Sequence, residues 1–201
     1  KQQPERSAQS TDLLFEAEKS LIVLLLKRGL YEINVENAEN GETQPMRVDQ
    51  YIFNELYNDG IVLRNPLLLK MYEHYAEVAE IIQNQDDIKR TFLLSEDKEE
   101  SAFAMNHIAS EDPEYSPLWE KRFDMYTNSV QNSRMVLQQE VENTLLTLKL
   151  RIAEQQKAFL EKELANAEYT EEDKNGILQK IVFADKIRQK IAKRLNMTVS
   201  R

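Results

Sequence analysis

Cysteine is absent from all 201 residues of the sequence, which excludes disulfide bonds, thiolate metal sites and thiol nucleophiles. Glycine and proline are scarce, with four and five copies, too few turn-forming residues for an all-β protein. No segment has the pattern of a signal peptide, and the longest apolar run, Leu21 to Leu26, is far shorter than the ~20 residues of a membrane span. These absences predict a soluble helical protein of a reducing cytosol that does not enter a membrane.

The charge of the chain is acidic overall but unevenly distributed. Its 26 basic and 35 acidic side chains give a net charge of −9, which repels nucleic-acid phosphates, so we expect no direct binding of nucleic acid. Residues 180–201 nevertheless carry a net charge of +6, which leaves −15 on residues 1–179. Basic residues complement the dipole at the end of a helix, and as a cluster they can also steer an acidic partner.

Hydrophobic periodicity in the first part of the chain predicts helices. Residues 1–10 are polar and are predicted to be the remnant of a linker, with a helix beginning after Thr11. The apolar stripe of this helix consists of Leu14, Ala17, Leu21, Leu24 and Leu25. Residues 31–45 are rich in turn formers and acids, which predicts a surface loop before a helix over residues 46–58.

Three further helices are indicated before residue 110. Asn65 followed by Pro66 predicts a helix start, because asparagine caps a free N–H group and proline has no such group to leave unpaired. Two shorter helices are expected over residues 87–94 and 96–109, with Asp86 and Ser95 as their caps.

The last part of the sequence predicts long helices. A second cap-and-proline signal, Ser116-Pro117, is followed by no proline or glycine before Gly176. An apolar stripe with the spacing of helix-to-helix packing consists of Val141, Leu145, Leu148, Ile152 and Phe159. Thr170 is predicted to cap a final helix, with three acidic residues in its first turn. The core stripe of that helix consists of Ile177, Ile181, Ala184, Ile191 and Leu195.

These elements predict an all-α fold, a multi-helix bundle followed by a long helix and a C-terminal antiparallel helical hairpin. The predicted divisions are a linker remnant (1–10), a helical bundle subdomain (11–127), the long helix with the hairpin (128–197) and a tail (198–201).

Residues that support catalysis or metal binding are few. A di-iron bundle needs paired Glu-x-x-His motifs, and neither His74 nor His107 has a glutamate three residues before it. His74 and Glu77 are spaced i, i+3, but one such pair is more often a surface hydrogen bond. The four glycines are isolated, so they form no glycine-rich loop for a phosphate. We expect no catalytic residue, no metal and no cofactor.

The final helix is apolar around much of its circumference. At about 100° per residue, Phe183 lies about 120° from Ile177 on one side and Val182 about 140° on the other. A helix apolar over so wide an arc is either enclosed by the rest of its own chain or exposes a docking surface. The candidate partner contacts are Leu178, Val182, Phe183, Lys186, Ile187 and Lys190. Their apolar side chains would anchor a partner and their charges would steer it.

Several segments of the sequence resemble the C-terminal helicase-binding domain of bacterial DNA primase. They are Leu21 to Gly29, Val48 to Leu56, Asp59 to Pro66 and Leu145 to Arg151. The similarity in the order of elements extends over about residues 12 to 197.

This resemblance implies a helical bundle followed by a hairpin that docks onto the N-terminal domains of the hexameric replicative helicase. Docking would hold the primase at the replication fork in the bacterial cytoplasm and stimulate the helicase. The family makes RNA primers with a zinc-binding domain and an acidic polymerase domain, neither of which is present in this sequence. The resemblance therefore implies a non-catalytic part of an enzyme.

Two other kinds of protein fit the same residues. One is a helical adaptor or coiled-coil structural module that self-associates through the stripe from Val141 to Phe159. The other is a bundle enzyme, which would need a bound metal or cofactor.

Overall fold

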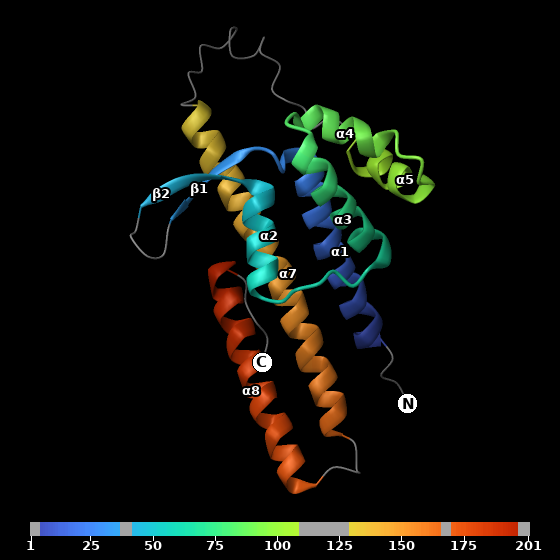
Figure 1. Cartoon of the computed structure of the whole chain (residues 1–201). Coiled ribbons are helices and arrows are strands. Elements are labelled where there is room, and N and C mark those ends of the chain that lie inside the picture. Colours follow the sequence, from blue (N-terminus) through green and yellow to red (C-terminus); the bar gives the residue numbers. More distant parts are fainter. Residues whose placement is uncertain (1–4, 37–41, 109–128, 166–169, 197–201) are drawn as a thin grey trace. The chain divides into compact units, whose positions relative to one another are not determined.

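The computed structural model describes residues 5–36, 42–108, 129–165 and 170–196, and most of them are helical (Figure 1). The elements in chain order are α1 (Glu5–Arg28), β1 (Glu32–Glu36), β2 (Thr43–Arg47), α2 (Val48–Asn58), α3 (Pro66–Ile81), α4 (Gln85–Leu93), α5 (Lys98–His107), α7 (Ser129–Leu164) and α8 (Glu171–Arg194). The predicted all-α fold is confirmed, with one small two-stranded sheet added to it. Among the described helices, none contains a stretch that is both long and apolar enough to cross a membrane.

The chain divides into two compact units. The first consists of Lys1–Glu18 and Asn143–Arg201, and we call it the hairpin unit. The second consists of Lys19–Glu142, and we call it the bundle unit. The divisions fall within α1 and α7, so each of these helices contributes to both units. The boundary that the sequence predicted near residue 127, the Ser116-Pro117 signal and the predicted tail lie outside the described residues.

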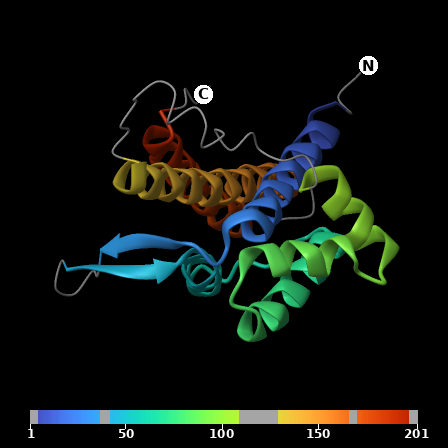
Figure 2. The same cartoon turned by 90° about the horizontal axis from the view of Figure 1, so that it is seen from above.

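The hairpin unit contains the predicted antiparallel pair of long helices, α7 and α8, which lie side by side (Figures 1 and 2). An ion pair between Lys157 Nζ and Asp185 Oδ1, 2.9 Å apart, links the two helices and shows which of their residues lie at the same level. The buried side chains are Leu14 and Ala17 of α1, Leu145, Leu148, Leu150, Ala153 and Leu160 of α7, and Ile177, Ala184, Ile191 and Ala192 of α8. The core stripe expected for α8 is therefore correct at its main positions, with Ile181 and Leu195 half-buried.

One residue of the stripe predicted on α7 is not in the core. Val141, Leu145 and Leu148 are buried and Ile152 is half-buried, but Phe159 is 60% exposed. Further along the helix the buried positions move to Ala153 and Leu160. A stripe of apolar residues stays buried only while a neighbouring helix runs along it. Near the C-terminal end of α7, the buried residues lie on a different face of the helix.

The apolar run of α1 is buried on nearly all sides within the bundle unit, as its sequence predicts. Its buried residues are Leu21, Ile22, Leu24, Leu25 and Leu26. The predicted start of this helix after Thr11 is wrong, because α1 begins at Glu5 and so includes residues 5–10. These residues follow Pro4 and contain no proline or glycine, so nothing in them ends a helix.

The segment predicted as a surface loop contains a β-hairpin. Strands β1 and β2 pair in antiparallel register, with Ile33 opposite Met46 and Glu32 opposite Arg47. In β1 polar and apolar residues alternate, and Ile33 is buried while Glu32 and Asn34 are exposed. This two-residue period is the sequence signal of a half-buried strand. The turn-forming residues on either side of this alternating segment favour a loop, which is why the sequence predicts a loop here.

The helix caps are placed by local sequence. Asn65 Oδ1 accepts hydrogen bonds from the backbone N–H groups of Leu67 and Leu68, at 3.0 and 3.1 Å, which confirms the predicted start of α3. The caps of the next two helices differ from the prediction. Asn84 caps α4 and Asp97 caps α5, in place of Asp86 and Ser95.

Two predicted caps therefore have other roles. Asp86 lies inside the first turn of α4, where its charge opposes the helix dipole. Ser95 Oγ accepts a hydrogen bond from the backbone N–H of Asp97 at 3.2 Å and so supports the true cap.

A buried glutamine joins α4 to the end of α1 within the bundle unit. Gln85 Nε2 donates to the backbone carbonyls of Leu25 and Leu26 at 3.2 and 2.7 Å, and Gln85 Oε1 accepts from the N–H of Leu30 at 2.7 Å. The last carbonyls of a helix have no partner within the helix, so this side chain acts as a C-terminal cap supplied from a distant part of the chain.

Candidate functional site

The helix that carries the predicted contacts begins at a well-formed cap. Thr170 Oγ1 accepts from the N–H of Asp173 at 3.2 Å, and the N–H of Thr170 donates to Asp173 Oδ2 at 3.1 Å. This capping box confirms the predicted start of α8. Hydrogen bonding to Thr170 lowers the pKa of the Asp173 carboxyl group. The acidic first turn and the basic last turn of α8 both complement its dipole.

All six predicted contact residues are on the exposed part of α8. The exposed fractions are 44% for Leu178, 52% for Val182, 65% for Phe183 and 38% for Ile187, and the side chains of Lys186 and Lys190 are also exposed. The described residues therefore leave these four apolar side chains largely uncovered. Exposed apolar groups in such a cluster are typical of interaction surfaces.

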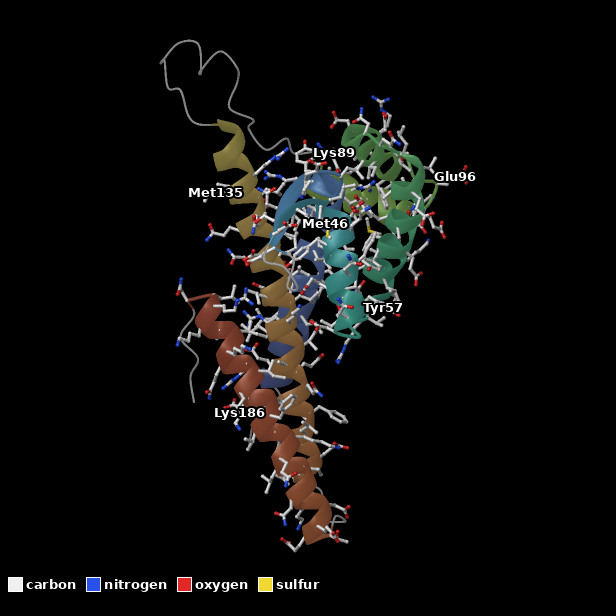
Figure 3. All side chains as sticks on the ribbon, turned by 60° about the vertical axis from the view of Figure 1, so that its left-hand side comes forward. Met46, Tyr57, Lys89, Glu96, Met135 and Lys186 are labelled. Carbon is white, nitrogen blue, oxygen red and sulfur yellow. The ribbon has the colours of Figure 1, made fainter. Side chains whose placement is uncertain are left out.

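The six residues form three pairs spaced i, i+4, each pair on one line along the helix. Leu178 and Val182 make one apolar line, Phe183 and Ile187 make another, and Lys186 and Lys190 lie between them. In Figure 3 Lys186 projects from α8 on the side away from α7. The face therefore has a basic centre and two apolar flanks.

A shallow depression of about 610 Å³ runs along this face and is open to solvent. Its lining residues are Asn175, Leu178, Gln179, Val182, Phe183 and Lys186, all from α8. This surface is open to solvent and its flanks are apolar. It therefore suits the side chains of another protein better than a small ligand, which needs a site that encloses it.

The charges on this face are not neutralised by the rest of the described chain. Among the described residues, no ion pair involves the exposed cations Lys180, Lys186, Lys190, Lys193 and Arg194. The one acid in this part of α8, Asp185, is already engaged by Lys157 and by Arg188, each at 2.9 Å. The hydrogen bond from Lys157 and the charge of Arg188 lower the pKa of Asp185.

Each of the two histidines contacts another side chain of the bundle unit. His74 Nδ1 lies 3.0 Å from Glu100 Oε2, and not on Glu77 as the spacing suggested. Ser95 Oγ also donates to Glu100 Oε2, at 2.9 Å. The ring of His107 packs on Phe103, with centroids 4.6 Å apart. In the part of the chain that the structure describes, no group of three histidine or acidic side chains is arranged to hold a metal.

The buried carboxylate of Glu100 was missed at the sequence level. The pair Glu99-Glu100 lies in the first turn of α5, where the helix dipole accounts for the exposed Glu99 alone. Glu100 is buried because it precedes Phe103 and Ala104 by three and four residues and so lies on the same buried face of α5. That spacing was the available signal.

Comparison with known proteins gives one match. No curated protein and no solved structure matches the chain significantly. A family model described as a domain of unknown function, DUF8430, matches residues 4–199. Because this match covers nearly the whole sequence, the chain belongs to the DUF8430 family.

Proposed function

We propose that this chain is the helicase-docking domain of a bacterial DNA primase and that it binds the N-terminal domains of the hexameric replicative helicase. In this role it recruits the primase to the replication fork in the cytoplasm and stimulates the helicase. The domain itself catalyses no reaction and uses no cofactor. The observation that carries the proposal is the exposed face of α8, where two apolar lines flank a row of lysines.

The apolar flanks supply the affinity in this proposal. An exposed aromatic side chain such as Phe183 gains most from burial at the centre of an interface, where truncating an anchor costs about 2 kcal/mol or more. Together with the aliphatic side chains of Leu178, Val182 and Ile187, this side chain makes a small cluster of four apolar anchors on one helix. The surrounding polar residues would form the rim that excludes water from it.

In this proposal the exposed cations of α8 determine the orientation in which the partner approaches. In a chain with a net charge of −9, the exposed cations of α8 attract an acidic partner while the rest of the surface repels it. Approach is therefore favoured through this helix, and the effect weakens as salt screens the charges. The resemblance of Leu21 to Gly29 and Asp59 to Pro66 to the primase family supplies the identity of the partner.

Sedimentation of the chain with and without the replicative helicase hexamer of the same organism tests the proposal. We expect co-sedimentation at micromolar concentrations that weakens at high salt. The double variant Phe183→Ala, Ile187→Ala should bind at least about tenfold more weakly while its helical circular dichroism is unchanged. Tyr57→Ala with Val62→Ala is the matched control, since both residues are exposed on the bundle unit.

Three results would contradict the proposal in different ways. A folded chain that does not bind the helicase removes the partner. A Phe183, Ile187 double variant that unfolds shows that these side chains belong to the core. A dimer that forms with rising concentration of the chain alone favours the self-associating adaptor. Of the stripe proposed for that adaptor, Phe159 is exposed whereas Val141, Leu145 and Leu148 are buried.

A further inference from the structure

We propose that His74 and Glu100 form a pH-dependent clamp that fastens α5 to α3 within the bundle unit. The clamp is tighter when the ring of His74 carries a positive charge and looser when the ring is neutral. This inference goes beyond the proposed function and does not depend on it, because the chain alone is enough to test it.

The helix α5 carries a buried carboxylate that contacts α3. The side chain of Glu100 is 2% exposed, and its Oε2 atom lies 3.0 Å from His74 Nδ1. The same oxygen accepts a hydrogen bond from Ser95 Oγ at 2.9 Å. A buried carboxylate is costly unless it is hydrogen-bonded and paired with a cation. The stability of this packing therefore depends on the groups that surround Glu100.

The charge of Glu100 is only partly compensated when His74 is neutral. Glu100 Oε1 is buried, and among the described residues it accepts no hydrogen bond. The ammonium group of Lys70 lies 3.9 Å from this oxygen and forms its hydrogen bond with Asp97 instead. A charged imidazole in place of the neutral ring adds a direct attraction between opposite charges at the shorter distance of 3.0 Å.

His74 is suited to gain and lose a proton in this position. The side chain of histidine ordinarily changes its charge between about pH 5 and 8. The side chain of His74 is 31% exposed, so solvent reaches it, and its ring packs on Phe92 with centroids 4.7 Å apart. A carboxylate only accepts hydrogen bonds. Nδ1 therefore carries a hydrogen in both charge states, and Nε2 is the nitrogen that takes up the proton.

The two other charged groups at this site keep their charges over that pH range. Lys70 and Asp97 are hydrogen-bonded to each other, which raises the pKa of the lysine and lowers the pKa of the aspartate. On α4, Lys89 and Arg90 pair with Asp86 and Asp87 of the same helix. The other charged side chains beside His74 on α3 and around the start of α5 are exposed; they are Glu73, Glu77, Glu96, Lys98 and Glu99. Water screens these exposed charges, so the main change that Glu100 experiences is the charge of His74.

A fall in pH should therefore strengthen the contact between α3 and α5. The positive ring is next to the buried carboxylate only when α5 lies on α3. Its stabilising contribution is present at the acidic end of the histidine range and is lost as the pH rises.

Urea unfolding at two pH values tests the clamp. We expect His74→Gln to raise the equilibrium constant for unfolding about tenfold more at about pH 5.5 than at about pH 8, because the attraction that it removes is present only at the lower pH. The matched control is His107→Gln, which removes the other histidine of the chain. His107 packs on Phe103, and no ion pair involves it within the described ranges. The effect of the control should differ less than about twofold between the two pH values.

Two results of this experiment overturn the inference. One is an effect of His74→Gln that is equal at both pH values or larger at the higher one. The other comes from Glu100→Gln, which removes the negative charge and keeps the shape of the side chain. In that background the effect of His74→Gln should no longer depend on pH, and a dependence that remains would mean that Glu100 is not the partner.

Nuclear magnetic resonance of the unaltered chain covers the case in which a variant does not fold. The imidazole signals of His74 and the side-chain carboxyl signal of Glu100 should change together as the pH is varied, with a common midpoint. A carboxyl signal of Glu100 that stays constant while the ring of His74 titrates would overturn the inference without any substitution.

Discussion

Gly29 lies so close to Tyr75 that a Cβ atom added to the glycine would come within 2.0 Å of the tyrosine hydroxyl oxygen. Tyr75 is buried, and its hydroxyl group lies 3.4 Å from Asp49 Oδ2. Burial, reinforced by the negative charge of Asp49, raises the pKa of Tyr75. The N–H of Asp49 in turn donates to the Gly29 carbonyl at 2.8 Å. The end of α1 is thus held against α2 and α3 at a point that admits no side chain.

Gly29→Ala should destabilise the protein for this reason. The added methyl group forces Tyr75 or the backbone to move, and overpacking of this kind costs about 1–3 kcal/mol. Gly176→Ala is the matched control, because an added Cβ there meets nothing within 4 Å and the residue lies in the interior of α8. That change should stabilise by about 0.5–1 kcal/mol. Urea unfolding of both variants measures the difference, and equal effects would contradict the packing argument.

Gln85→Leu should also destabilise the bundle unit, although it keeps the side chain similar in size. The change removes the donor to Leu25 and Leu26 and the acceptor for Leu30, all in a buried region. A buried polar group left without its partner costs about 1–3 kcal/mol. We expect a loss of at least that size in the free energy of unfolding.

Gln83→Leu provides the control for this substitution. Gln83 is exposed and lies two residues before Gln85, in the connection between α3 and α4, so its loss should change stability by less than about 0.5 kcal/mol. If both glutamine variants unfold at the same urea concentration, the capping role assigned to Gln85 is wrong.

The ion pair of Asp185 predicts a dependence of stability on pH. The pKa of Asp185 is lowered in the folded chain, chiefly by the hydrogen bond from Lys157. Its stabilising contribution is therefore present above the ordinary aspartate pKa, and it is lost as the pH falls through the lowered value. Asp185→Asn should cost about 0.5–1 kcal/mol at neutral pH, because the pair is partly exposed. The two proteins should converge in stability only in acid, once the pH is below the lowered pKa of Asp185 in the folded chain.

Lys157→Gln tests the origin of that effect. If the hydrogen bond from Lys157 is the main cause, the double variant with Asp185→Asn should be little worse than either single variant at neutral pH. Thermal unfolding at neutral and acidic pH gives all four stabilities. Additive losses would show that the two side chains act independently.

The features predicted correctly from the sequence are those determined by neighbouring residues. Asn65 and Thr170 begin helices because each capping side chain accepts hydrogen bonds from backbone N–H groups no more than three residues away. The stripes of α1 and α8 are buried where predicted because helical periodicity alone places those residues on one face. The same periodicity placed Phe183 off the buried stripe and left open whether the rest of the chain covers it; its 65% exposure is a finding of the structure.

The features that were missed depend on distant parts of the chain. Gln85 is a cap only because the end of α1 lies beside it, some sixty residues away in sequence. Phe159 has the spacing of a core residue, and its exposure depends on which face of α7 is covered at that level. The β-hairpin forms because β1 pairs with β2, and the turn-forming residues of this segment do not indicate that pairing. No local pattern contains this information.

Reversal of the charges at the centre of the α8 face should weaken binding of the helicase hexamer in a salt-dependent way. Lys186 and Lys190 are exposed, and neither takes part in an ion pair within the described residues. Lys186→Glu with Lys190→Glu replaces attraction to an acidic partner by repulsion. We expect about a tenfold loss at low salt, mainly in the association rate, and a smaller loss at high salt where the charges are screened.

The control for the Lys186, Lys190 charge reversal must be a variant with the same net charge. Lys98→Glu with Arg90→Glu changes two exposed cations of the bundle unit and alters the total charge of the chain equally. If only the α8 variant binds weakly, the position of the charges matters and steering occurs through this helix. If both variants lose affinity equally, the overall charge is responsible. Undiminished binding of the α8 variant at low salt would mean that the apolar residues alone hold the partner.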